Sequence, residues 1–193
     1  MSPPGDVPVR LLKHPGPVAA QRWDSMACAR SRAFRFSLIP GRSLYDGIVN
    51  AMTAAGVSAA ALTLTGGVFA RVEYCLAAPR VGRPQVAGYT DPESMSGPIG
   101  LIGASATLGL DVEGRLMVHC HALLADPDGQ LFGGHVIPAA SIVGAVPPVV
   151  FARAFEGAAI RQRYDAETVM SIFHPAQPGE GSMRTSSEGL HVS

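Results

Sequence analysis

Three histidines near the middle of the chain have a spacing that could bind a metal ion: His119, His121 and His135. Because successive side chains of a strand point to opposite faces, His119 and His121 would share one face, about 6 to 7 Å apart along the strand. Three neutral imidazoles that leave a fourth position for water or substrate are typical of catalytic or ligand-exchanging zinc sites. These residues therefore predict a zinc site, with nickel, iron or manganese as alternative ions.

The segment between the histidines predicts the hairpin that would bring them together. Residues 115–125 and 130–137 are rich in apolar residues, and a turn sequence of Asp, Pro, Asp and Gly separates them. If the loop covers 126–130, His121 lies opposite His135, with the Cβ atoms about 4.5 to 5.5 Å apart. A loop longer or shorter by one residue would displace His135, so the site depends on this register.

The residues around the histidines leave alternatives open. Gly133 and Gly134 directly precede His135, and they would leave room for an ion or for a close backbone approach; a β-bulge that re-aims the strand is equally compatible and does not conflict with this role. The alternative to a metal site is a set of buried histidines with hydrogen-bond partners. Both faces of the strand around His119 are mostly apolar. Since an unpaired buried polar group costs about 1 to 3 kcal/mol, these imidazoles need either an ion or definite partners.

The remaining patterns predict an α+β fold, a single compact domain with a largely antiparallel sheet and a few covering helices. Ser43 is a candidate N-cap for a helix that closes at Gly56. Gly66 and Gly67 are expected to form the tight turn of a hairpin, and 79–98 is expected to be a loop. Strands are predicted at 32–39, 58–65, 68–76, 115–125, 130–137, 149–155 and 158–164, with one or two short strands within 99–110.

Composition divides the chain into one domain and two flanks. Its 193 residues are 47% hydrophobic, which is enough for one core. Residues 1–30 are expected to be an extended arm, 31–175 the domain, and 176–193 a flexible tail. No apolar run approaches the about 20 residues of a membrane span, which favours a cytoplasmic protein without a membrane partner. Cys28, Cys75 and Cys120 include no CxxC pair, which argues against a disulfide framework.

The charge balance gives little support to nucleic-acid binding. Fifteen basic and fifteen acidic side chains cancel, so the whole chain lacks the positive field that drives non-specific binding to DNA. The first 42 residues are more basic, because they contain Arg10, Lys13, Arg22, Arg30, Arg32, Arg35 and Arg42 but only Asp6 and Asp24. This pattern is typical of a solvated arm and also compatible with a local basic surface.

The sequence HCHALLADPDGQLFGGHV at 119–136 resembles a motif of the plants and prokaryotes conserved (PPC) domain, in which HxH, a turn with Asp and Gly, and GGH recur. The likeness extends over 33–165. It implies a homotrimer with the three histidines near the subunit contacts, sometimes occupied by zinc, and a distant fold relationship to the acetolactate decarboxylases. Family members are often described as DNA-binding, but in plants that activity belongs mainly to a separate AT-hook. Residues 80–84 here read RVGRP, in which Val81 interrupts the Arg-Gly-Arg-Pro core of such a hook.

Two functions follow from these observations. The first is a homotrimeric zinc-binding PPC-like domain with a regulatory or DNA-binding role. The second is a metal-dependent enzyme, a lyase similar to acetolactate decarboxylase or a hydrolase, acting on a small oxo or hydroxy acid bound at the metal. An enzyme also needs a proton carrier and a carboxylate clamp, for which the candidates are Glu73, Asp128, Glu156, Asp165, Arg71 and Arg153, each of which could equally be a surface charge. His14 and His174, each followed by Pro, are expected to be exposed loop residues outside the site.

Overall fold

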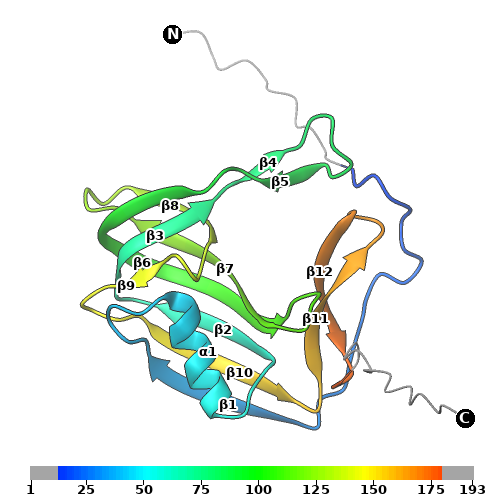
Figure 1. The fold of residues 1–193 in the computed structure, drawn as a ribbon, viewed down its shortest axis with the longest axis horizontal. Coiled ribbons are helices and arrows are strands. Elements are labelled where there is room, and N and C mark those ends of the chain that lie inside the picture. Colours follow the sequence, from blue (N-terminus) through cyan, green and yellow to red (C-terminus); the bar gives the residue numbers. More distant parts are fainter. Residues whose placement is uncertain (1–12, 180–193) are drawn as a thin grey trace, which may run out of the picture.

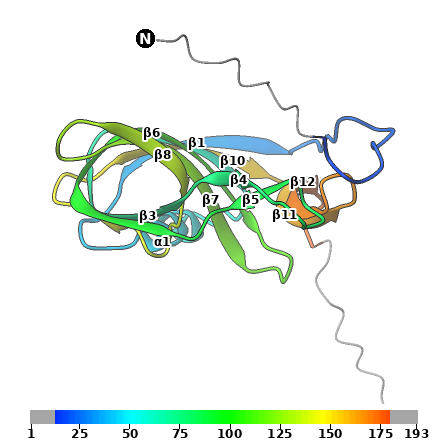
Figure 2. The ribbon, with the colours of Figure 1, turned by 90° about the horizontal axis from the view of Figure 1, so that it is seen from above.

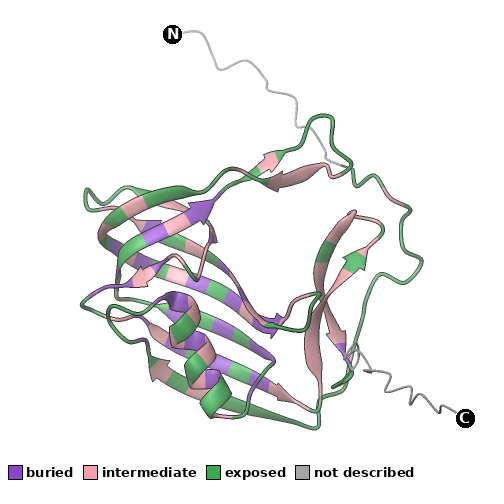
Figure 3. Ribbon diagram, viewed as in Figure 1, coloured by how far each residue is buried: buried purple, intermediate pink, exposed green. Residues whose placement is uncertain are grey.

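A large antiparallel β-sheet forms most of the protein in the computed structural model, which describes residues 13–179 (Figure 1). The elements, in chain order, are β1 Arg30–Ser37, α1 Leu44–Ala54, β2 Ala60–Thr65, β3 Val68–Cys75, β4 Ala77–Pro79, β5 Ala87–Tyr89, β6 Glu93–Leu110, β7 Leu116–Ala125, β8 Leu131–Val136, β9 Ile142–Val143, β10 Val149–Glu156, β11 Ala159–Asp165 and β12 Met170–Ala176. Burial alternates along β2 and β10, so one face of each strand belongs to the core and the other faces outward (Figure 3).

The main sheet curls back on itself. Its strand order is β1-β10-β2-β6-β7-β8-β3-β9, and β3 also pairs with β6. The 18-residue strand β6 makes this possible, because 104–108 pairs with β2 while 93–100 pairs with β3. Figure 2 shows the curled part, formed by β3, β6 and β8, at the opposite end of the molecule from β11 and β12.

The prediction of an α+β fold with a few covering helices is wrong. Within residues 13–179 there is one helix, α1, and the structure is mostly antiparallel sheet. Apolar side chains of the sheet are buried mainly against other parts of the same curled sheet, as Phe69, Ile99, Leu108 and Leu124 illustrate. Periodicity showed which residues are buried but not which kind of element covers them.

The single helix begins and ends as its sequence predicts. The Ser43 side chain accepts a hydrogen bond from the Asp46 backbone N–H at 3.0 Å and so satisfies an N-terminal donor. Leu44, Ile48 and Met52 lie on one face and are buried in the core. The helix thereby covers one end of the core, and the outer face of the sheet is left for other contacts (Figure 1).

The predicted hairpin at Gly66 and Gly67 does not form. β2 and β3 each pair with β6 in the antiparallel sense, so they run one after the other along the same edge of that strand. Both glycines have positive φ, and a Cβ on Gly67 would lie 2.5 Å from the Pro148 nitrogen. The two glycines therefore turn the chain tightly past 147–148 without reversing its direction.

Two further differences concern the segments around the candidate site. Residues 79–98, expected to be a loop, include β5 and the first part of β6, and 99–110 belongs to one long strand instead of short ones. The strand predicted at 158–164 corresponds to β11, whereas its partner β12 was not predicted. Residues 1–12 and 180–193 of the expected arm and tail lie outside the described residues.

The N-terminal segment 13–29 runs beside the β11–β12 hairpin (Figure 1). Backbone hydrogen bonds join Gly16 N–H to the Glu167 carbonyl at 3.0 Å and Ala29 N–H to the Glu156 carbonyl at 2.7 Å. The hairpin joins the main sheet through a parallel pairing of Arg161 with Leu110. None of the helical residues between 13 and 179 forms a segment long and apolar enough to cross a membrane.

Candidate metal centre

The β7–β8 hairpin has the register that the sequence predicts. Ala125 pairs with Leu131, and His121 lies directly opposite His135. The turn is held by the Asp126 carboxylate, which accepts hydrogen bonds from the backbone N–H groups of Asp128 at 2.9 Å and Gln130 at 2.8 Å. These local hydrogen bonds stabilise a loop that covers 126–130, and the length of this loop sets the position of His135.

The three imidazoles face one another on the outer side of the sheet. One ligand nitrogen from each of His119, His121 and His135 lies within 4.8 Å of the other two. The Nε2 atoms of His119 and His121 are 3.0 Å apart. The His135 ring centroid is 4.7 Å from that of His119 and 5.2 Å from that of His121. The convergence expected from strand geometry is therefore present.

Gly133 and Gly134 allow neighbouring backbones to approach β8 closely. A Cβ on Gly133 would lie 2.2 Å from the Ala122 carbonyl oxygen, and one on Gly134 would lie 2.5 Å from the Cys75 carbonyl oxygen. The pairing of β7 with β8 continues without a register shift through both positions. Of the two interpretations, close backbone approach is confirmed, and the β-bulge is not formed.

The surroundings of the histidines favour the neutral imidazole. Burial, followed by the neighbouring His119 and His121, lowers the pKa of His135 to about 4. Burial is also the larger cause that lowers the pKa of His119, with His121 as the second cause. Both rings are half-buried, whereas His121 is exposed. A neutral imidazole is the form that binds a metal ion, so these two ligands need not lose a proton near neutral pH.

One nitrogen of the cluster has no protein partner. His135 Nδ1 is buried and makes no hydrogen bond within the described residues. His174 Nε2, outside the cluster, is also buried without a hydrogen-bond partner, so the convergence of the three rings carries the assignment more than the orphaned atom does. An orphaned buried nitrogen beside two other converging imidazoles is what a site for a transition-metal ion provides, and the donor set fits one.

A cavity of about 460 Å³ opens onto His119 and His135. It lies among β4, β5, β7 and the β11–β12 hairpin, and its lining is mostly apolar, as shown by Met117, Ile172 and Phe173. The Tyr89 ring stacks on the His135 ring with the centroids 4.3 Å apart, and Phe173 meets His119 edge-on at 6.2 Å. Sequence reasoning did not find Tyr89 or Phe173, because they come from segments whose contact with β7 leaves no local signal.

The candidate proton carriers have partners away from the histidines. Glu73 forms an ion pair with Arg71 at 3.2 Å, and Glu156 pairs with Arg30 and Arg32. Asp165 accepts a hydrogen bond from the Thr168 N–H at 2.7 Å. Asp128 belongs to the hairpin turn, and Arg153 is an exposed residue of β10. The structure therefore does not bring these six candidates to the cluster.

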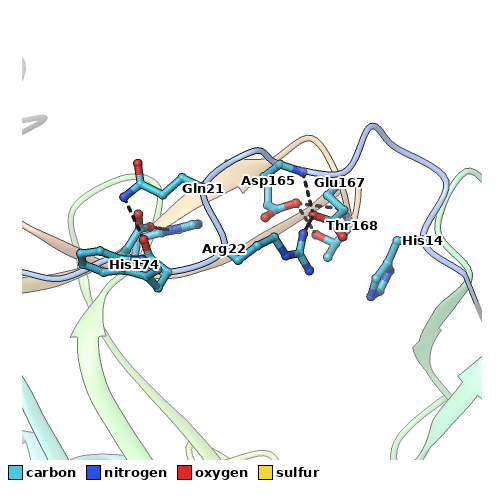
Figure 4. A pocket seen from close by; sticks show the side chains of 10 residues that line it. His14, Gln21, Arg22, Asp165, Glu167, Thr168 and His174 are labelled. Atoms are coloured by element: carbon cyan, nitrogen blue, oxygen red, sulfur yellow. Dashed lines mark hydrogen bonds and ion pairs between the residues drawn. The ribbon is translucent and has the colours of Figure 1, made fainter.

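His14 and His174 both line a second, more polar pocket of about 400 Å³, in which they lie apart (Figure 4). His174 is a half-buried residue of β12 rather than an exposed loop residue, and its Nδ1 is 2.8 Å from a carboxylate oxygen of Asp24. Glu167 accepts hydrogen bonds from Arg22 and from the backbone of Ala19. These contacts attach the N-terminal segment to the β11–β12 hairpin.

Three arginines of the N-terminal region form ion pairs with two carboxylates. Arg22 pairs with Glu167, and Arg30 and Arg32 share Glu156. Arg80, in the hook-like segment 80–84, donates a hydrogen bond to the Tyr89 carbonyl and so braces β4 and β5. Arg22, Arg30, Arg32 and Arg80 thus make internal contacts.

Comparison with known proteins agrees with the geometry. Residues 26–155 match the family model of the Plants and Prokaryotes Conserved (PCC) domain, which confirms the resemblance of the histidine motif. No curated protein matches the chain significantly.

Several solved structures share the fold. The metal-containing protein AF0104 from Archaeoglobus fulgidus has a TM-score of 0.61 and 18% identity, over 80% of this chain and 99% of that one. A plant- and prokaryote-conserved protein of Pyrococcus horikoshii has a TM-score of 0.57 and 20% sequence identity, over 77% of this chain and 93% of that one. A candidate DNA-binding protein of Ralstonia eutropha JMP134 has a TM-score of 0.57 and 14% sequence identity, over 72% of this chain and 89% of that one.

Proposed function

Because this chain belongs to the Plants and Prokaryotes Conserved (PCC) domain family, we propose that it is a metal-binding domain in which His119, His121 and His135 hold one zinc ion. The observation that carries the proposal is the meeting of three ligand nitrogens within 4.8 Å of one another. The partnerless, buried Nδ1 of His135 supports it. The description of the Archaeoglobus fulgidus protein as metal-containing agrees with it.

Zinc is the ion that this donor set fits best. Three imidazole nitrogens and one open position form a common tetrahedral arrangement for zinc, while nickel, iron and manganese can use similar ligands. When bound, the ion would act as a Lewis acid toward an anion or a carbonyl oxygen at the open position. The chain itself positions the rings through the β7–β8 register and shields one side of His135 with Tyr89.

A homotrimer is part of the proposal. Large apolar side chains of the strands next to the histidines are exposed, with Ile102 at 52%, Leu123 at 45% and Leu131 at 66%. Exposed apolar groups that lie near one another are typical of contact surfaces between subunits. The family resemblance implies that the histidines lie near such contacts, so we expect assembly to bury this part of the surface.

DNA binding is a weaker second role. The candidate DNA-binding proteins among the structural neighbours favour it, whereas the ion pairs of Arg22, Arg30 and Arg32 reduce the positive charge available to phosphates. Electrophoretic shifts at several salt concentrations, with and without residues 1–42, test it. No shift near physiological salt would discard this role.

The enzyme alternative would need a proton carrier beside the ion. Tyr89 is the titratable side chain that lies against His135, and burial, followed by the charge of Cys75, raises its pKa. Such a phenol would exchange a proton slowly near neutral pH. We therefore place binding before catalysis, and turnover of a small oxo acid by zinc-loaded protein would reverse that order.

Elemental analysis tests the central proposal. Protein purified without added metal should contain about one zinc per chain, and His121→Ala should contain far less. His174→Ala is the matched control, because His174 lies on β12 and pairs with Asp24 instead. Equal metal content in wild type and His121→Ala would refute the site, and size measurement of both proteins would show whether assembly depends on the ion.

A further inference from the structure

The cavity beside the histidines joins two chemically different parts. His119 and His135 form one part of the wall, where the proposed divalent ion would be held by imidazole ligands. The rest of the wall is mainly hydrocarbon, including Met117, Ile172 and Phe173. A volume of about 460 Å³ lies within the usual range for sites that bind small molecules.

We propose that this cavity binds a medium-chain monocarboxylate, with the carboxylate at the ion and the hydrocarbon chain against the apolar wall. The inference rests on the proposed metal site. An anionic oxygen is attracted to a divalent ion whose positive charge is not compensated by its three imidazole ligands. The lining side chains other than the histidines carry no formal charge, and Gln162 and Ser171 are the polar ones besides Tyr89.

The same lining argues against a dicarboxylate or a small polar acid. A second carboxylate in this cavity would lose its hydration without meeting a cationic side chain, which is costly. A hydrocarbon chain gains from the same environment, because each buried methylene group contributes about 0.8 kcal/mol. The wall therefore selects for one charged end and one apolar end.

The β11–β12 hairpin supplies a large part of the apolar wall. Ile172 and Phe173 lie beyond residues 26–155, the part that matches the PCC family model. Gly109 allows the hairpin to pack against β6, since a Cβ there would lie 2.7 Å from the Ile160 carbonyl oxygen and 2.9 Å from a ring carbon of Phe173. The ligand specificity would thus depend on side chains of β12 as well as on the histidine hairpin.

Isothermal titration calorimetry of the zinc-loaded full chain tests the inference with three acids. Octanoate carries both the head and the tail, acetate carries only the head, and suberate places a second carboxylate at the far end of the chain. We expect octanoate to bind at least about tenfold more tightly than either of the others, because only octanoate matches both ends of the cavity. Removal of the ion by chelation should lower the affinity for octanoate, because the carboxylate then loses its partner.

Two variants on opposite walls locate the binding. Ile172→Glu places a negative charge in the cavity from β12, and Ala87→Trp fills it from β5. Both should lower octanoate affinity at least about tenfold while metal content stays at the wild-type level. Tyr164→Glu is the matched control, because it adds the same charge to an exposed residue of the same hairpin that is outside the cavity lining.

The outcomes separate the two proposals. Protein that holds zinc but binds octanoate no more tightly than acetate overturns the inference and leaves the metal site intact. Wild-type octanoate affinity in both Ile172→Glu and Ala87→Trp also overturns it. Protein that holds no metal overturns the proposed function, and the inference with it.

Discussion

The β7–β8 hairpin and the β11–β12 hairpin both carry histidine, but the groups that face the rings differ. On β7–β8, His119, His121 and His135 face one another, and burial lowers the pKa of two of them. On β11–β12, His174 faces the carboxylate of Asp24 at 2.8 Å. An imidazole beside a carboxylate has an internal partner for one nitrogen, whereas three converging imidazoles can offer their nitrogen lone pairs to a cation. The contact of His174 with Asp24 therefore has a structural role, whereas the three clustered histidines form a candidate binding site.

Removal of the metal should have the largest effect and should act through the β7–β8 hairpin. An ion at a thousand times its dissociation constant stabilises the native state by about 4 kcal/mol. We therefore expect chelation to lower the denaturation midpoint by several degrees, with restoration when zinc is added. Thermal unfolding followed by circular dichroism is the measurement. An unchanged midpoint after complete metal removal would contradict the account.

Substitution of one histidine in each hairpin should sharpen the contrast. His135→Ala removes one of three ligands and should weaken zinc binding by roughly a hundredfold or more, because two imidazoles hold the ion poorly. His174→Ala should leave zinc affinity unchanged within about twofold, since its ring is tied to Asp24 and not to the cluster. Competition with a chromogenic chelator measures both. Similar losses in the two variants would erase the distinction.

The pH dependence of the metal-free protein offers a third comparison. The folded-state pKa of His135 is about 4, below its ordinary value of 6.5. Between pH 6.5 and pH 4 the unfolded chain therefore binds more protons than the folded chain. The contribution of His135 to the free energy of unfolding should be fully present above pH 6.5 and should fall as the pH is lowered toward 4. Since one pKa unit is worth about 1.4 kcal/mol and the ring is half-exposed, a loss of roughly 1 to 2 kcal/mol is expected.

Urea unfolding between pH 7 and pH 4.5 measures this loss; toward pH 4.5 the carboxyl groups of Glu156 and Asp165, whose pKa values are lowered, begin to contribute as well. His135→Gln should reduce the slope, and His119, whose pKa is also lowered by burial, accounts for part of the slope that remains. A stability that stays level in wild type over this interval would show that His135 is not held in the neutral form by burial.

The smallest expected effect concerns the tie between the N-terminal segment and β12. Asp24→Asn removes the charge that faces His174 in a partly exposed pair, so a loss of about 0.5 to 1 kcal/mol is expected. The loss of stability should be confined to β11 and β12, where amide hydrogen exchange should become faster, and the zinc content should not change. Slower or equal exchange in these strands, or a fall in zinc content, would count against a purely structural tie.

The part of the site that could be predicted from the sequence is the part that rests on local chemistry. Asp126 satisfies the turn by itself, so loop length, strand register and the meeting of His121 with His135 all follow from neighbouring residues. Helix α1 was predictable for the same reason, since Ser43 caps it locally.

The rest depends on contacts between distant segments. Gly66 and Gly67 fit a hairpin turn, yet the edge of β6 holds β2 and β3 in line, and no local pattern reports that pairing. The fold class was wrong because apolar strands can be covered by a curled sheet as well as by helices. Tyr89 and the β11–β12 wall reach the site from 27 or more positions away from the nearest of the three cluster histidines, in segments that look like ordinary loop and strand.

X-ray absorption spectroscopy at the zinc edge tests most directly whether three imidazoles share one ion. Wild-type protein loaded with one equivalent of zinc should show a shell of light scatterers at about 2.0 to 2.1 Å with the multiple-scattering pattern of three imidazole rings. In His119→Ala the imidazole contribution should fall. A sulfur shell at about 2.3 Å, or a spectrum that is the same in the wild type and in His119→Ala, would contradict the assignment of the ion to these histidines.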